Sequence, residues 1–143
     1  VVRRMARDLL FDVEVVGAPT VREADGLALS SRNVHLGREA RRQATVLVRS
    51  LETAARAVAA GERSAAALLE TVEREIGKAP LAQIDYAELR DPETLAPAPA
   101  VLEGPVLLAL AVVFDAPEGE GAPVRLIDNR VLDPSPVDGR KSP

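Results

Sequence analysis

The feature that most constrains the fold is a run of nine consecutive apolar residues, Val106 to Phe114. A membrane span needs about 20 apolar residues, whereas a short uninterrupted run is typical of a strand with neighbours on both sides. The run therefore predicts a central strand that is covered on both faces. A second strand is predicted where Ile84 and Tyr86 alternate with their neighbours, and a third over Val124 to Ile127.

Two helices are predicted before these strands. Apolar residues recur at helical spacing from Arg38 to Val58, and Gly61 follows as a helix-ending glycine, which indicates one long helix. Ser64 can cap a second helix that ends near Gly77. We expect the two helices to form an antiparallel hairpin on a small, mainly antiparallel sheet, so that residues 31–131 make an α+β domain.

The first residues follow a different pattern. A short amphipathic helix over residues 1–10 leads into a valine-rich strand from Val13 to Val16, an order that belongs in a parallel sheet. One apolar strand alone would leave an unpaired edge. We therefore expect residues 1 to about 23 to be the end of a larger α/β domain whose beginning is missing, and residues 132–143, which are rich in proline, to be a disordered tail.

The composition excludes several classes of function. With 18 basic and 22 acidic residues the net charge is −4, and no basic block is long enough to follow a phosphate backbone, so we expect no nucleic-acid partner. No apolar stretch is long enough for a membrane span. The absence of cysteine excludes disulfides and thiolate zinc sites and suits the cytoplasm. A single histidine leaves little scope for a metal site.

The strongest candidate site is the sequence Ser30-Ser31-Arg32-Asn33. Two hydroxyls, a guanidinium and an amide are good donors to phosphate oxygens. Serine and asparagine are also common cap residues, so a polar loop that caps the next helix is the alternative. Just upstream, Asp25-Gly26 predicts a turn between two short, partly apolar runs.

The other polar clusters are explained more simply as solvated surface: His35, Asp12 with Glu14, the acidic loop residues Asp115, Glu118 and Glu120, and the helix arginines Arg3, Arg4 and Arg7. The acidic loop lacks the ordered ligand spacing of a calcium site. Contact with another domain is the alternative for the three arginines. We expect the loop over residues 115–123 to affect only the surface.

The residues around the candidate site carry a resemblance to a known family. The run from Val16 to Asn33, with Pro19-Thr20-Val21-Arg22-Glu23 and Asp25-Gly26-Leu27-Ala28 before the serines, closely resembles the pantothenate synthetase, or pantoate–β-alanine ligase, family. The opening helix and the segments Asp85 to Arg90 and Leu126 to Asn129 are also similar to that family. The resemblance covers residues 1 to about 131 and places the chain in the family's C-terminal portion.

The resemblance implies an ATP-dependent ligase that adenylates pantoate with MgATP and then lets β-alanine displace AMP. Residues 1–30 would end a Rossmann-like nucleotidyltransferase domain, and residues 31–131 would form a lid domain. Val21 and Leu29 would lie against ATP, while Ser30, Ser31 and Arg32 would bind its phosphates. The resemblance also implies a cytoplasmic enzyme that is a homodimer when its N-terminal half is present.

The chain also departs from the family's pattern. The His-x-Gly-His signature for adenylation, the glutamines for pantoate and the Gly-x-Lys-Asp segment of the family's first half are absent. We therefore expect no catalytic residue in this chain and no activity from it alone. Two alternatives are a non-catalytic binding or regulatory module that keeps the lid fold, and a small α+β interaction domain whose serine-arginine loop is only a cap.

Overall fold

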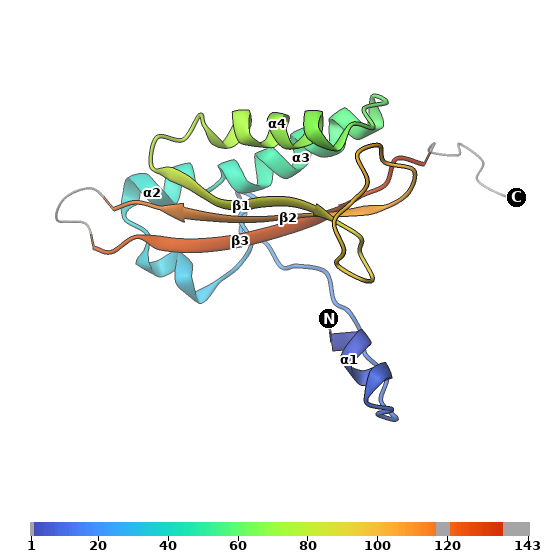
Figure 1. Cartoon of the computed structure of the whole chain (residues 1–143). Coiled ribbons are helices and arrows are strands. Elements are labelled where there is room, and N and C mark those ends of the chain that lie inside the picture. Colours follow the sequence, from blue (N-terminus) through green and yellow to red (C-terminus); the bar gives the residue numbers. More distant parts are fainter. Residues whose placement is uncertain (1, 117–120, 136–143) are drawn as a thin grey trace, which may run out of the picture.

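The computed structural model describes residues 2–116 and 121–135. In chain order its elements are α1 (Val2–Asp8), the 3-10 helix η1 (Ser31–His35), α2 (Arg38–Gln43), α3 (Val46–Ala59), α4 (Ala65–Ile76), β1 (Ala82–Arg90), β2 (Val106–Phe114) and β3 (Val124–Leu132). Figure 1 shows α3 and α4 along one face of the sheet, with α1 projecting away from the α+β body that runs from η1 to β3. The predicted helical hairpin on a small antiparallel sheet is confirmed.

The apolar run is the central strand of the sheet, as predicted. The sheet is antiparallel with the order β1-β2-β3, and β2 pairs with β3 over its whole length. Alternate side chains of β2, such as Leu108 and Leu110, are buried in one hydrophobic core with residues of α3 and α4. On the other face Leu107 and Ala109 are only partly buried. The helices thus cover one face of the sheet, which corrects the prediction that both faces are covered.

The predicted long helix is divided into α2 and α3. Between them, the Leu47 amide donates to the carbonyl of Ala44, only three residues earlier, at 3.1 Å. The Thr45 hydroxyl donates to the carbonyl of Arg42 at 3.0 Å, and a hydroxyl that bonds the preceding turn tends to bend a helix. The apolar stripe is therefore continuous in sequence, but the helix that carries it is not.

The connection between α3 and α4 agrees with the prediction. Gly61 has a φ of +105° just after the last turn of α3, a conformation that glycine adopts without steric cost. The Ser64 hydroxyl accepts a hydrogen bond from the amide of Ala67 at 3.3 Å and so caps α4. These two local signals place the turn of the helical hairpin.

The third strand is longer than predicted. It continues beyond Ile127 to Leu132, which is buried in the core. Pro134 is also buried, and its carbonyl accepts a hydrogen bond from Arg63. Residues 132–135 of the predicted tail are therefore part of the folded body, because Leu132 and Pro134 are buried against it. Residues 136–143 of that tail, and residues 117–120 of the loop before β3, lie outside the described residues.

The N-terminal helix is confirmed as α1, but the strand predicted from Val13 to Val16 is absent. A strand exists through hydrogen bonds to a neighbouring strand, and no strand among the described residues pairs with this segment. The segment makes local hydrogen bonds instead: the Val13 amide donates to the carbonyl of Phe11 at 2.9 Å, and the Arg3 side chain donates to the carbonyl of Val15 at 3.2 Å. The Rossmann-like domain before the α+β body stays a prediction.

Candidate functional site

Residues 21–29 form a tight hairpin. The amide of Leu29 donates to the carbonyl of Val21 at 2.9 Å, which holds the two ends of the hairpin together. Gly26 turns the chain with a φ of +88°, a region that residues with a Cβ rarely adopt. The predicted turn at Asp25-Gly26 is thus confirmed.

The hairpin is anchored in the hydrophobic core by Leu27. This side chain is 1% exposed and belongs to the same cluster of buried residues as the apolar faces of α3 and β3. Burial of a leucine stabilises a fold by roughly 1.5–3 kcal/mol. The hairpin therefore packs with the α+β body, and the domain boundary predicted at residue 30 stays a prediction.

Two apolar side chains of the hairpin remain open to solvent. Val21 is 66% exposed and Leu29 is 64% exposed, although the hydrogen bond between their backbones makes them neighbours. We call this pair the Val21–Leu29 ledge. The ledge is a small apolar surface that comes directly before the serine-arginine sequence.

The serine-arginine sequence follows the ledge directly. Ser30 is the N-cap of η1, and its hydroxyl oxygen accepts a hydrogen bond from the Arg32 amide at 3.2 Å, so the capping interpretation holds for this residue. Ser31 and Arg32 are exposed. Within the described ranges 2–116 and 121–135, the Arg32 guanidinium has no hydrogen bond or ion pair. It is a permanent cation that is free to bind an anion.

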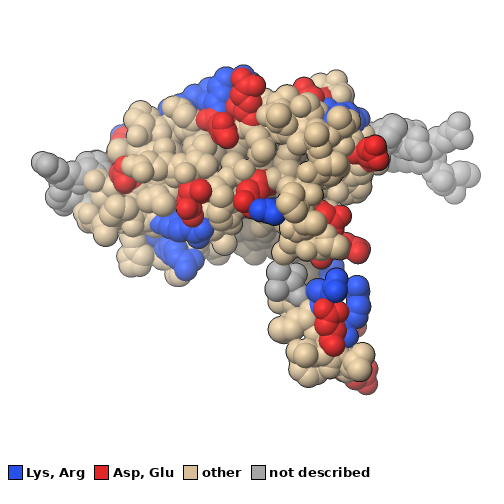
Figure 2. All heavy atoms as spheres, in the orientation of Figure 1, with Lys and Arg blue, Asp and Glu red and all other residues tan. Residues whose placement is uncertain are grey.

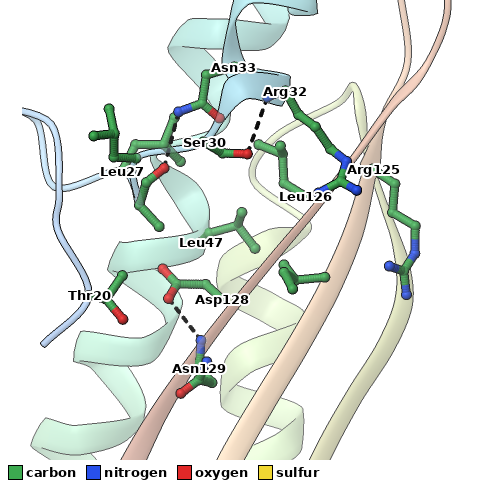
Figure 3. A pocket seen from close by; sticks show the side chains of 13 residues that line it. Thr20, Leu27, Ser30, Arg32, Asn33, Leu47, Arg125, Leu126, Asp128 and Asn129 are labelled. Carbon is green, nitrogen blue, oxygen red and sulfur yellow. Dashed lines mark hydrogen bonds between the residues drawn. The ribbon is translucent and has the colours of Figure 1, made fainter. Parts of the chain in front are cut away.

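A pocket of about 280 Å³ lies beside these residues, between η1 and β3. Figure 3 shows the Arg32 side chain reaching from η1 toward β3, with Leu47 and Leu126 also at the pocket. The full lining comprises Thr20, Leu27, Ala28, Leu29, Ser30, Arg32, Asn33, Leu47, Arg125, Leu126, Ile127, Asp128 and Asn129. The structure thus gathers Leu29, Ser30 and Arg32 at one pocket, while Val21 and Ser31 are not among its lining residues.

A polar network connects the hairpin to η1 and α2. The Glu23 carboxylate accepts hydrogen bonds from Arg41 at 2.7 Å and from the Asn33 side-chain amide at 2.6 Å. Arg41 also donates to Asp25 at 2.7 Å. Arg41, and secondarily Asn33, hold the pKa of Glu23 below its ordinary value, and Arg41 likewise lowers the pKa of Asp25. The network thus lets both hairpin carboxylates stay ionised at a lower pH than free carboxylates would.

A second ionic contact connects the hairpin to the sheet. Arg22 binds the Asp128 carboxylate with both terminal nitrogens, at 2.7 and 3.0 Å, across 106 positions of sequence. Asp128 is buried. Sequence reasoning assigned no role to this pair or to Arg41. The sequence held one signal for Asp128. Every second residue of β3 faces the core, and Asp128 follows Val124 and Leu126 in that series.

The remaining polar candidates take no part in this site. His35, Asp12 and Glu14 are exposed, as expected, and Arg4 pairs with Asp8 on α1 at 2.7 Å. Glu118 and Glu120 lie outside the described residues. In the part of the chain that the structure describes, no three His, Cys, Asp or Glu residues are grouped as metal ligands would be.

The charged side chains are mixed in sign on one face of the molecule (Figure 2). On the face drawn in Figure 2, small basic and acidic groups lie next to one another between uncharged atoms. Over residues 2–116 and 121–135, no helix has both the length and the apolar character that a membrane crossing requires.

Comparison with known proteins assigns this arrangement to a family. The family model described as pantoate-β-alanine ligase matches residues 1–131, which include the hairpin, η1 and nearly all of the sheet. The chain belongs to this family. The predicted resemblance to pantoate–β-alanine ligases is thus confirmed.

Individual pantoate–β-alanine ligases are similar to this chain in sequence and in structure. The pantothenate synthetase of Desulfatibacillum aliphaticivorans is 49% identical over 134 residues, which cover 94% of this chain and 45% of the relative. The crystal structure of pantothenate synthetase from Thermus thermophilus is 43% identical with a TM-score of 0.79, and the match covers 95% of this chain and 45% of that one.

A more distant ligase shares the fold. The structure of the pantoate-β-alanine ligase from Francisella tularensis is 23% identical with a TM-score of 0.52, over 94% of this chain and 40% of that one. The chain therefore spans less than half the length of these three pantoate–β-alanine ligases.

Proposed function

We propose that the chain is the C-terminal part of an ATP-dependent ligase that condenses pantoate with β-alanine to pantothenate, with AMP and pyrophosphate as the other products. Its family membership supports the reaction. The Francisella ligase is complexed with β-γ ATP and β-alanine, which supports these two substrates. The observation in this chain that carries the proposal is the unpaired, exposed Arg32 guanidinium beside the Val21–Leu29 ledge.

The proposed reaction has two half-reactions. In the first, a carboxylate oxygen of pantoate attacks the α-phosphorus of MgATP, and the bond from that phosphorus to the bridging oxygen breaks as pyrophosphate leaves. In the second, the β-alanine amine attacks the acyl carbon of pantoyl-adenylate, AMP leaves, and the nitrogen loses a proton. Only the first half-reaction develops charge on a departing pyrophosphate. Mg²⁺ enters as part of the MgATP substrate.

The residues of this chain would serve the first half-reaction. The Val21–Leu29 ledge would contact the nucleotide through apolar surface. Arg32 would stabilise the departing pyrophosphate, since a pair of unit charges about 4 Å apart is worth roughly 4 kcal/mol at an effective dielectric constant of 20. Stabilisation of charge that develops in the transition state accelerates a reaction.

The two serines can add hydrogen bonds to the phosphates. The Ser30 hydroxyl accepts a hydrogen bond as a cap, but a hydroxyl also has one proton to donate. Ser30 can therefore cap η1 and bind a phosphate oxygen at once. Ser31 is exposed beside it. Two neutral donors and one cation form a site whose strongest member is Arg32, because charge-assisted hydrogen bonds are about twice as strong as neutral ones.

A hybrid ligase tests this function. In the hybrid, this chain replaces the matched 134 residues of the Desulfatibacillum relative. We expect the hybrid to make pantothenate, and Arg32→Ala to slow pantoyl-adenylate formation by about 10²-fold, as for the loss of one transition-state donor. Ser30→Ala should slow the same step less. The measurement is rapid-quench formation of pyrophosphate.

The second half-reaction and a matched arginine are the controls. Attack of β-alanine on preformed pantoyl-adenylate needs no triphosphate, so Arg32→Ala should leave it nearly unchanged. Arg42→Ala removes an exposed arginine of α2 that is not at the pocket and should change neither step. Equal slowing of both half-reactions by Arg32→Ala would exclude the phosphate role. A wild-type hybrid that folds but makes no pantothenate would leave the non-catalytic binding module as the better description.

A further inference from the structure

The buried carboxylate of Asp128 is the starting point. Among the described residues it is the one acidic side chain that is buried, with 2% of the side chain exposed. Its direct partner across the sheet is Leu110, which is fully buried. One carboxylate oxygen also accepts the amide of Asn129 at 2.8 Å. A charge in such surroundings needs a fixed, well-directed partner.

Arg22 provides that partner and also fixes its own hairpin. Its two terminal nitrogens bind the two Asp128 oxygens at 2.7 and 3.0 Å. One of these nitrogens also donates to the carbonyl of Gly26, in the hairpin turn, at 3.0 Å. A planar guanidinium can make these bonds together, whereas a lysine ammonium lacks the fork geometry. The hydrogen bonds to Asp128 are the main cause of a raised pKa of Arg22.

Stability alone does not account for such a pair. Removing two charges from water is costly, and apolar residues of similar volume often give a fold of equal or greater stability. What apolar residues lack is direction, because hydrophobic contacts are not directional. Two parallel hydrogen bonds between rigid planar groups fix both the distance and the orientation of the elements that carry them.

The elements fixed here carry the proposed nucleotide-binding residues. Arg22 directly follows Val21, and its partner lies on β3 at the pocket that Ser30 and Arg32 also line. We propose that the Arg22–Asp128 pair is a positioning device that sets the Val21–Leu29 ledge and the serine-arginine sequence at a fixed place over β3 for ATP. The assignment rests on the proposed function, and neither residue of the pair is a catalytic residue.

The fold provides independent support for the hairpin, so the pair can be removed without unfolding the chain. Leu27 anchors the hairpin in the core, and Arg41 holds Glu23 and Asp25 from the side of α2. The loss of Arg22 and Asp128 together also leaves no uncompensated charge in the core. We therefore expect the double variant Arg22→Met/Asp128→Leu to fold.

The experiment first measures the order of the hairpin in the 143-residue chain. The probes are the backbone amides of Glu23 and Leu29, which donate across the hairpin at 2.8 and 2.9 Å. Their hydrogen exchange should be about tenfold faster in the double variant, since local opening becomes easier, while the midpoint of thermal unfolding stays within a few degrees of wild type. Arg22→Lys, which keeps the charge and loses the fork, should give an intermediate rate.

The second measurement uses the hybrid ligase. The double variant should raise the KM for ATP about tenfold or more, since misplaced binding groups lose much of their effect, and leave the KM for β-alanine unchanged. Global destabilisation would instead lower the active fraction and leave the KM for ATP unchanged. Arg49→Met is the matched control. It removes the ion pair between Arg49 of α3 and Glu75 of α4, whose side chains lie 3.4 Å apart, and this pair does not involve the hairpin.

The outcomes distinguish a failure of this inference from a failure of the proposed function. Unchanged exchange at Glu23 and Leu29 in the double variant would overturn the inference whatever the hybrid does. Faster exchange with an unchanged KM for ATP, in an active hybrid, would reduce the pair to a structural contact and also overturn it. A folded but inactive wild-type hybrid would overturn the proposed function, and the positioning role with it.

Discussion

The side-chain amide of Asn33 donates to the carboxylate of Glu23 across 2.6 Å, which ties η1 to the hairpin ten residues earlier. The same nitrogen donates to the carbonyl of Ala28 at 3.1 Å. These two acceptors determine the orientation of the amide, and the oxygen Oδ1 is left buried without a partner among the described residues. Asn33 thus acts here only as a donor, through Nδ2. Replacing that nitrogen by an oxygen, as in aspartate, would put an acceptor where two acceptors already lie.

Replacement of Asn33 by aspartate should destabilise the chain in a pH-dependent way. The new carboxylate would face the carboxylate of Glu23 in a buried position, which raises the pKa of the new carboxyl in the folded state. The destabilisation is therefore full at neutral pH and decreases as the pH falls toward the ordinary pKa of an aspartate, about 4. Urea unfolding of wild type and Asn33→Asp between about pH 4 and pH 7 measures the difference.

Asn129→Asp is the control for this prediction. Asn129 lines the same pocket but is exposed, so its replacement adds the same charge in water. Its effect on stability should be small and nearly independent of pH. An Asn33→Asp deficit that does not shrink on acidification would show that lost packing, not carboxylate repulsion, is the cause.

Arg41 should control the titration of both hairpin carboxylates. It is the main cause of the lowered pKa of Glu23 and of Asp25. A carboxyl with a lowered pKa stabilises the fold above its unfolded pKa, and this contribution is lost as the pH falls through the folded pKa. In Arg41→Met, side-chain NMR titration should find both pKa values raised and the acid dependence of hairpin stability reduced. Arg42→Met, one residue later, should move neither pKa.

The two turn glycines provide a matched pair for backbone strain. Both Gly26 and Gly61 have positive φ, at +88° and +105°, so alanine at either position should cost roughly 1–2 kcal/mol. A Cβ at Gly26 would also come within 3.3 Å of Val48, whereas a Cβ at Gly61 would meet nothing within 4 Å. We expect Gly26→Ala to be the more destabilising in urea unfolding. Equal costs would mean that Val48 moves aside freely.

The 143-residue chain alone should form no pantothenate from pantoate, β-alanine and MgATP. The adenylation histidines and the pantoate-binding glutamines that the family resemblance calls for are absent from it. Product measured by mass spectrometry should stay at the level of a blank without protein, while the hybrid ligase serves as the positive reaction. Pantothenate above the blank would show that the chain carries catalytic groups that its sequence does not reveal.

The sequence by itself determined the features that depend on neighbours in the chain. The apolar run of β2, the cap at Ser64 and the turns at Gly26 and Gly61 all act over a few residues, and each was found where it was predicted. The candidate site, Val21 with Leu29 to Arg32, was proposed from a contiguous stretch of sequence through its family resemblance, and its role in ATP binding stays a prediction.

Only the tertiary structure decided the features that depend on distant partners. The strand expected at Val13 to Val16 is absent, because strand formation needs a neighbouring strand that no described residue provides. Leu132 became a strand residue because β2 is long enough to pair with it. The pairing of Arg22 with Asp128 has no local signature, since 106 positions separate them. Periodic patterns determine which residues form an element, but the partner of a charged side chain is determined by which elements the fold brings together.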